Sequence, residues 1–109
     1  MASAEGLKEV GYFDCAGGGQ IRVDGTTAYI GHMANPFGTS IFDVADPKNP
    51  KLLSHIGMPE GTHSHKVHAQ GDLMVRNHEL IGPGMPDDFH TGVGIYDVSD
   101  NTNPRQIST

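Results

Sequence analysis

The sequence predicts an all-β chain with no significant helix, and three observations support that fold class. Glycine and proline are frequent, with 15 and 7 residues among 109, which favours many turns between short elements. No long run of residues keeps the apolar spacing of a helix without a glycine or proline interrupting it. The chain also repeats itself, which indicates that one small structural unit occurs more than once.

The repeat is visible in two pairs of segments. "IFDVADPKNPK" (Ile41–Lys51) aligns with "IYDVSDNTNPR" (Ile95–Arg105), and "IRVDGTTAYIGH" (Ile21–His32) aligns with "VHAQGDLMVRNH" (Val67–His78). The first pair is spaced eight residues further apart than the second pair. The second unit therefore carries an insertion between its two matching segments.

Each unit is expected to contain four strands. Asp24-Gly25 and Gln70-Gly71 are hairpin turns, because a tight two-residue turn needs a positive φ that glycine adopts easily. The Pro/Asn-rich segments after each "DV" pair end the third strand, because proline cannot continue a central strand. The expected strands are Gly19–Val23, Thr27–Gly31, Thr39–Val44 and Lys51–Ile56 in the first unit, and Ser64–Ala69, Leu73–Asn77, Val93–Val98 and Arg105–Ser108 in the second.

A repeated four-stranded unit of about 40–50 residues is typical of a β-propeller blade. We therefore expect residues 1–109 to form a partial β-propeller domain, with a leading strand in 1–18, blade one in 19–57 and blade two in 58–109. Propellers typically need four or more blades to close. The chain is thus expected to be an N-terminal fragment whose partners are the remaining blades, or a small open sheet that associates with itself.

The segments "GTTAYIGHMANPFGTSIFDVADPKNPKLL" and "GVGIYDVSDNTNPRQI" resemble the LVIVD-repeat family of β-propellers, and the resemblance covers about residues 19–109. The second unit departs from the pattern, with Asn101 where the first unit has Pro47. The resemblance implies a propeller fold. It implies no particular reaction, because a fold does not assign chemistry.

Charge and composition exclude several classes of protein. The net charge is −6, and the seven basic residues form no run or stripe, which argues against nucleic-acid binding. No signal peptide and no membrane-spanning stretch is evident, so the cytoplasm is the default location. The single cysteine excludes an internal disulfide framework.

The stretch "EGTHSHKVHAQGDLMVRNHE" contains a cluster of histidines that the repeat does not explain. His63 and His65 align with Gly17 and Gly19 of the first unit, so the fold does not require histidine at either position. Glycine at Gly17–Gly19 instead favours a close approach of backbone at the start of a strand. The His-x-His element is therefore a candidate for a function that is particular to the second unit.

The expected turn at Gln70-Gly71 determines which side chains meet. It places His63 opposite His78 and His65 opposite Arg76, and the alternation of side chains then puts all four on one face. The same alternation turns His68 to the other face.

The inserted loop "ELIGPGMPDDFHTG" is expected at the same end of the blade. Imidazole and carboxylate groups suit zinc, iron, copper or manganese, so the sequence predicts a divalent transition-metal site. The predicted metal ligands are His63, His65, His78 and His90. The predicted substrate-binding residues are Arg76, Glu79, Asp87 and Asp88.

Three functions remain open from the sequence. One is a metal-dependent enzyme in which no catalytic residue is yet assigned; a histidine-lined channel or small-molecule site without metal is the alternative for the same residues. The second is a non-enzymatic propeller scaffold that binds a protein or polymer partner through its loop face. The third is a structural segment whose histidines have no special role.

Overall fold

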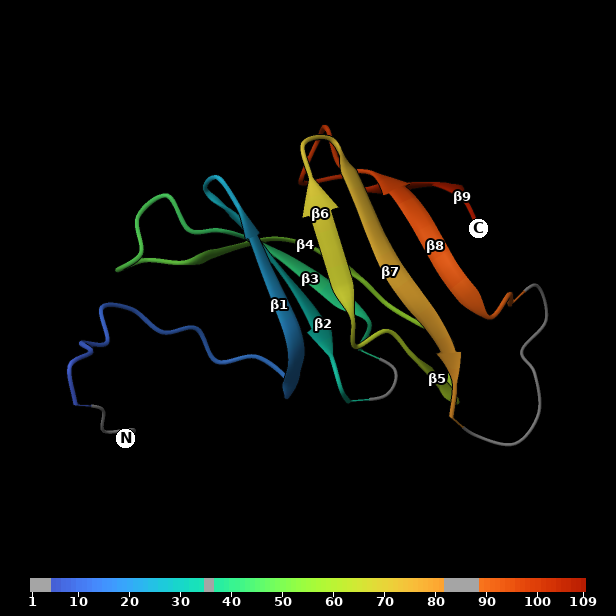
Figure 1. The fold of residues 1–109 in the computed structure, drawn as a ribbon, viewed down its shortest axis with the longest axis horizontal. Coiled ribbons are helices and arrows are strands. Elements are labelled where there is room, and N and C mark those ends of the chain that lie inside the picture. Colours follow the sequence, from blue (N-terminus) through green and yellow to red (C-terminus); the bar gives the residue numbers. More distant parts are fainter. Residues whose placement is uncertain (1–4, 35–36, 82–88) are drawn as a thin grey trace.

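The structure is a computed structural model that describes residues 5–34, 37–81 and 89–109, and these residues form two antiparallel sheets and no helix (Figure 1). The first sheet has the strand order β1-β2-β3-β4, so each strand pairs with the next along the chain. The second has the order β5-β7-β8-β9, with β6 also pairing with β7. The first sheet contains β1 (Gly18–Asp24), β2 (Thr27–His32), β3 (Thr39–Asp43) and β4 (Lys51–Ile56). The second contains β5 (Thr62–His63), β6 (Val67–Gln70), β7 (Leu73–Leu80), β8 (Gly92–Asp97) and β9 (Arg105–Ser108).

The prediction of an all-β chain without helix is confirmed, but the second sheet has five strands instead of four, and the hairpin turns lie one residue later than expected. Asp24 still pairs with Thr27 and Gln70 with Leu73. The two turn residues are thus 25–26 and 71–72. Gly25 and Gly71 hold the first turn position with φ values of 60° and 59°, which only glycine adopts without strain.

The predicted leading strand in 1–18 is wrong for the part that the structure describes, because residues 5–17 contain no strand and β1 begins at Gly18. Phe13 of this segment packs its ring edge-on against Phe42, with ring centroids 4.9 Å apart. The leading segment therefore contacts the first sheet through side chains.

The predicted strand Ser64–Ala69 is correct only in its second half, because β6 begins at Val67, and the separate short strand β5 precedes it at Thr62–His63. In β5, His63 pairs with Glu79, whereas in β6, Val67 pairs with Arg76, so the register shifts by one residue between the two pairs. The residues between them bond to the first sheet. Ser64 forms a bridge with His32, and the His65 carbonyl accepts a hydrogen bond from the Gln20 amide at 2.9 Å.

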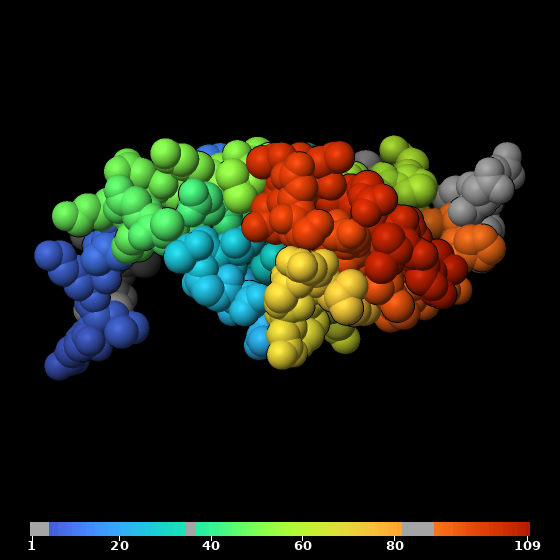
Figure 2. Space-filling model, turned by 90° about the horizontal axis from the view of Figure 1, so that it is seen from above, coloured from blue at the N-terminus to red at the C-terminus, as the bar shows by residue number. Residues whose placement is uncertain are grey.

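The hydrophobic core lies between the two sheets and is shared by both. Tyr29 and Ile41 of the first sheet pack with Met74, Tyr96 and other buried residues of the second. Met74 and Ile41 have no exposed surface. The molecule is elongated, measuring 46 × 30 × 18 Å, with the sheets next to each other along its long axis (Figure 2). We call the two surfaces that enclose this core the inner faces, and the opposite surfaces the outer faces.

In Figure 1, β1 lies beside β6, and a series of hydrogen bonds connects the two strands. In each bond a side chain of β1 reaches a main-chain group in the β6 hairpin, 47 residues further along. The pairs are Gln20 with the Val67 amide at 3.1 Å, Arg22 with the Ala69 carbonyl at 3.1 Å, and Asp24 with the Gly71 amide at 2.8 Å.

Candidate functional site

Two histidines and one glutamate of the second unit converge on one small volume. Each of His63, His65 and Glu79 offers a ligand atom, and the three atoms lie within 4.8 Å of one another. His63 comes from β5 and Glu79 from its partner strand β7, where the two are paired in register. His65 comes from the segment that leaves β5 for the first sheet. We call these three residues the His–Glu cluster.

The contacts inside the cluster are close. His63 Nε2 lies 2.7 Å from Glu79 Oε2, and His65 Nδ1 lies 3.4 Å from the same oxygen. The two imidazole rings meet edge-on with centroids 4.6 Å apart. The hydrogen bond from His63 holds the pKa of Glu79 below its usual range, with smaller contributions from the positive charges around it. Glu79 is therefore a carboxylate at neutral pH.

Burial differs sharply across the cluster. Only 8% of His63 is exposed, and its Nδ1 atom is buried without a hydrogen-bond partner among the described residues. The side chain of Glu79 is 47% exposed. The described part of the protein therefore does not supply every hydrogen bond that the His63 ring can form, and a buried polar atom without a partner costs free energy. The exposed carboxylate leaves one side of the cluster open to solvent.

Asn77 contacts two members of the cluster, His65 and Glu79, and helps to orient them. Its amide nitrogen is 3.4 Å from His65 Nδ1 and 3.5 Å from Glu79 Oε2. Its amide oxygen accepts a hydrogen bond from the Lys66 amide at 2.9 Å, which replaces a bond of the strand ladder. Such supporting contacts fix the direction of metal ligands in proteins.

Two glycines of the first sheet let the His65 backbone approach closely. A side-chain Cβ at Gly19 would lie 2.8 Å from the His65 oxygen, and one at Gly31 would lie 2.5 Å from its carbonyl carbon. Both distances are shorter than a real contact allows. The prediction of close backbone approach is thus confirmed at Gly19, and the crossing segment that carries His65 is held by the first sheet.

The predicted single face that held four site residues is wrong. His63 pairs with Glu79 instead of His78, and Arg76 pairs with Val67 instead of His65. The one-residue shift in register between β6 and β5 puts the His63 side chain on the face opposite to Arg76 and His78. Arg76 and His78 therefore lie on the inner face, away from the His–Glu cluster.

The remaining predicted site residues do not join the cluster. His90 is exposed, and its main-chain oxygen lies 3.3 Å from His78 Nδ1. Asp87 and Asp88 lie outside the described residues. His68 is exposed and stands outside the cluster, as the sequence predicts.

His32, the counterpart of His78 in the first unit, is satisfied by the protein. Its Nδ1 atom lies 2.9 Å from the Ala16 carbonyl oxygen and its Nε2 atom 2.7 Å from Ser40 Oγ. Only 2% of the residue is exposed. His32 therefore has a structural role in joining the leading segment to β2 and β3.

Arg76 lies almost completely buried on the inner face, with 4% exposure. Its guanidinium donates to the hydroxyls of Tyr96 and Thr39 at 3.0 and 3.2 Å. It also donates to the carbonyl oxygens of Ile56 and Gly57 at 3.1 and 3.3 Å. Burial lowers the pKa of Arg76, although it stays charged at any ordinary pH. Arg76 thus connects the second sheet to the end of β4.

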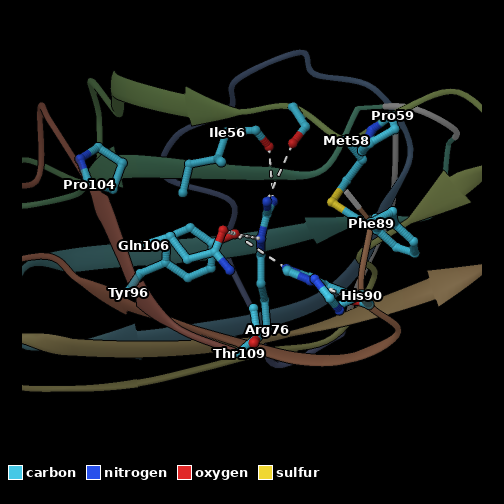
Figure 3. Close-up of a pocket in the computed structure, with 12 residues that line it drawn as sticks. Ile56, Met58, Pro59, Arg76, Phe89, His90, Tyr96, Pro104, Gln106 and Thr109 are labelled. Carbon is cyan, nitrogen blue, oxygen red and sulfur yellow. Dashed lines mark hydrogen bonds between the residues drawn. The ribbon is translucent and has the colours of Figure 1, made fainter. Parts of the chain in front are cut away.

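A cavity of about 500 Å³ opens beside Arg76 (Figure 3). Figure 3 shows Arg76 between Tyr96 and Gln106 on one side and Phe89 and His90 on the other. Burial lowers the pKa of His78, which also lines the cavity, and the charge of Arg76 lowers it further. His78 is therefore neutral at pH 7.

Sequence reasoning missed the roles of Asn77, Tyr96 and Gln106. It also assigned Glu79 to substrate binding, whereas the structure groups Glu79 with two imidazoles. A comparison of the two units position by position would have found Tyr96 and Gln106, since the first unit has Phe42 and Leu52 there. No comparable signal marks Asn77, because its contacts depend on the broken strand.

Comparison with known proteins gives one informative relative. The chain is 30% identical over 87 residues to "Uncharacterized protein MJ1554" of Methanocaldococcus jannaschii. The match covers 80% of this chain and 13% of the archaeal protein, so the chain spans a small part of its relative. No protein-family profile and no solved structure matches the chain. Among the described residues there is no helix with the length and apolar character needed to cross a bilayer.

Proposed function

We propose that the chain binds a divalent transition metal at His63, His65 and Glu79. The observation that supports this is the convergence of three ligand atoms within 4.8 Å, contributed by two imidazoles and an ionised carboxylate. Small side-chain rotations would bring such atoms to the distances of about 2.0–2.2 Å at which nitrogen and oxygen bind zinc. The ion would replace the His63–Glu79 contact with stronger bonds.

The donor set favours a site with open positions. Two histidines and one carboxylate occur in catalytic zinc sites and in mononuclear iron sites, where water or substrate takes the remaining coordination positions. The ion would supply Lewis acidity or a bound water of lowered pKa. The protein's own contribution is the geometry, in which Asn77 orients His65 and Glu79, and the first sheet holds the His65 backbone. A metal-dependent enzyme is the functional class that this donor set supports best.

The competing explanation is a hydrogen-bonded pair of histidines on an exposed glutamate, with no metal. That explanation accounts for Glu79 and its contacts, and His63 Nδ1 lacks a partner among the described residues under both explanations, because the ion would bind Nε2, the atom that faces Glu79. The two explanations differ in stoichiometric metal binding and in the dependence of that binding on both histidines.

Calorimetric titration of chelator-treated protein with zinc, supported by elemental analysis, tests the proposal. We expect one equivalent to bind to the wild type, and binding to be lost in the His63→Ala/His65→Ala double variant. His68→Ala is the matched control, since His68 is exposed nearby and outside the cluster. Circular dichroism of the metal-free variants checks that they stay folded. Zinc binding in the double variant at wild-type affinity would refute the proposal.

We also propose that the two sheets are blades of a β-propeller. The support is that each sheet is an antiparallel meander and that the contacts between them recur at a constant spacing of 47 residues. The resemblance to the LVIVD repeat stays a prediction. The domain bounds 19–57 and 58–109 likewise stay predictions, since nothing else delimits the units.

Large apolar side chains on both sheets lie uncovered, which supports further blades or self-association as partners. Ile21 and Val23 of β1 are 61% and 53% exposed, and Leu73 of β7 and Ile107 of β9 are 52% and 53% exposed. A large contiguous patch of exposed apolar side chains often marks an interface. Light scattering should therefore show association of the chain at micromolar concentrations, and Ile107→Lys should weaken it. A monomer at every concentration would contradict self-association.

A further inference from the structure

The second unit carries three polar residues where the first unit carries apolar ones. Arg76 corresponds to Ile30, Tyr96 to Phe42 and Gln106 to Leu52. The strand pairing supports these matches, because Phe42 pairs with Leu52 in the first sheet and Tyr96 pairs with Gln106 in the second. The architecture of the unit therefore accepts an apolar set at these positions, and the polar set needs another explanation.

The three polar residues form one connected group, which we call the Arg–Tyr–Gln group. Arg76 Nε donates to Tyr96 Oη at 3.0 Å, and Tyr96 Oη lies 3.4 Å from Gln106 Oε1. The guanidinium carbon of Arg76 also lies 4.8 Å from the centre of the Tyr96 ring, within the range of a cation–π contact. Three coordinated replacements that contact each other indicate a common purpose.

The charge of Arg76 has no counter-anion among the residues that the structure describes. All four of its hydrogen bonds go to neutral acceptors, namely two hydroxyls and two main-chain carbonyls. None of the ion pairs in the described ranges includes Arg76. A buried guanidinium without an opposite charge is strongly disfavoured unless an anion comes to it. A guanidinium has five N–H donors, so one remains for a ligand.

The space beside the group suits a small organic molecule. The cavity of about 500 Å³ falls in the range of small-molecule sites. Its other walls are largely apolar and include Met58, Pro59 and Phe89. Phe89 stacks on the His78 ring with centroids 5.7 Å apart, which gives a flat aromatic surface. Figure 3 shows Met58 and Phe89 close together, on the side of the cavity opposite Gln106.

We propose that this cavity binds a small organic carboxylate with an aromatic or apolar body. The carboxylate would take the free N–H of Arg76 and compensate its charge. The body would lie against Met58 and Phe89. The site is separate from the His–Glu cluster, because Arg76 and Glu79 project from opposite faces of β7. The two proposals therefore stand or fall independently.

Benzoate is the probe, and benzamide is its uncharged counterpart of nearly the same shape. Titrations followed by calorimetry and by amide NMR shifts are run with a chelator present, which removes metal as a carboxylate receptor. We expect saturable binding of benzoate with a Kd of about 1 mM or below. We expect benzamide to bind about tenfold more weakly or not at all, because only the anion pairs with the guanidinium.

The decisive variant gives the second unit the apolar set of the first: Arg76→Ile, Tyr96→Phe and Gln106→Leu together. Replacing a buried charged group with apolar residues is often neutral or stabilising, so we expect a folded protein that no longer binds benzoate. Arg76→Met alone is the second variant, for use if the triple variant does not fold. The His63→Ala/His65→Ala variant should bind benzoate as the wild type does.

Several results would overturn the proposal. These are equal affinity for benzoate and benzamide, wild-type benzoate binding in a folded triple variant or in Arg76→Met, and no saturable benzoate binding up to roughly 10 mM. Loss of benzoate binding in the His63→Ala/His65→Ala variant would also overturn it, because it would place the carboxylate at the His–Glu cluster.

Discussion

Replacing Asn101 with alanine tests how the two sheets are held together. Asn101 lies in the turn between β8 and β9, yet its side chain contacts the first sheet. Its Oδ1 accepts a hydrogen bond from Tyr29 Oη at 3.3 Å, and its Nδ2 donates to Thr27 Oγ1 at 3.2 Å. Its main-chain oxygen accepts a bond from Ser54 at 2.6 Å, which alanine would keep. The substitution therefore removes two bonds between the sheets and leaves the third.

The expected cost follows from those two bonds. A neutral hydrogen bond contributes about 0.5–1.5 kcal/mol to the free energy of unfolding, so Asn101→Ala should cost about 1–3 kcal/mol. The upper half of that range applies if Tyr29 Oη stays unsatisfied, since Tyr29 is only 2% exposed. For a domain of this size, each kcal/mol lowers Tm by about 4–8 °C.

Urea unfolding of Asn101→Ala, Tyr29→Phe and the double variant isolates the bond between the two side chains. The double variant should be more stable than the sum of the single costs implies, by about 0.5–1.5 kcal/mol. Asn103→Ala is the control, because Asn103 is exposed in the same turn and should change stability by less than about 0.5 kcal/mol. Additivity within about 0.3 kcal/mol would refute the bond between Tyr29 and Asn101.

Three further predictions concern the core, the glycine contact and the turns. Met74→Ala should cost about 2–5 kcal/mol in urea unfolding, because Met74 has no exposed surface and alanine leaves a cavity. Gly31→Ala should lower zinc affinity and stability by displacing the His65 backbone, whereas Gly57→Ala, with open space at its Cβ, should change zinc affinity little. The hydrogen bond from the Asn49 side chain lowers the pKa of Asp46, so its NMR titration midpoint should lie below that of an aspartate in an unfolded chain. Its stabilising effect is complete above the unfolded carboxyl's pKa and is lost as the pH falls through the folded value; a midpoint at or above that of an unfolded aspartate would contradict this.

The sequence located most strands because their local signals are strong. Three kinds of signal determine the structure of the few residues around them: the turn glycines, the alternating apolar residues and the Pro/Asn segments. For this reason β2, β4 and β9 lie within one residue of their predicted bounds. The leading strand was not found, because residues 5–17 form no strand pairing with the described part of either sheet. No local pattern reports whether a sheet edge is available for pairing.

The site was predicted only in part because register is not a local property. The sequence marked His63 and His65 as special, and the structure brings them together. It placed Arg76 and His78 with them because one unbroken strand was expected, whereas the register shifts by one residue between β6 and β5, which turns His63 to the face of Glu79. The break between β5 and β6 depends on contacts of Ser64 and His65 with the first sheet, which no pattern within the second unit reveals.

The series of hydrogen bonds between β1 and β6 has a consequence for how such a chain can change. The side chains of Gln20, Arg22 and Asp24 form hydrogen bonds with main-chain groups. Every residue except proline has the same main-chain amide and carbonyl groups. The side chains of β6 therefore contribute little to the contact with β1. A duplicated unit could dock beside its parent from the start, while its own residues remained free to acquire new chemistry. Contacts to main-chain groups do not depend on which side chains the second unit carries. They would therefore tolerate changes such as histidines in place of glycines and a buried arginine in place of isoleucine.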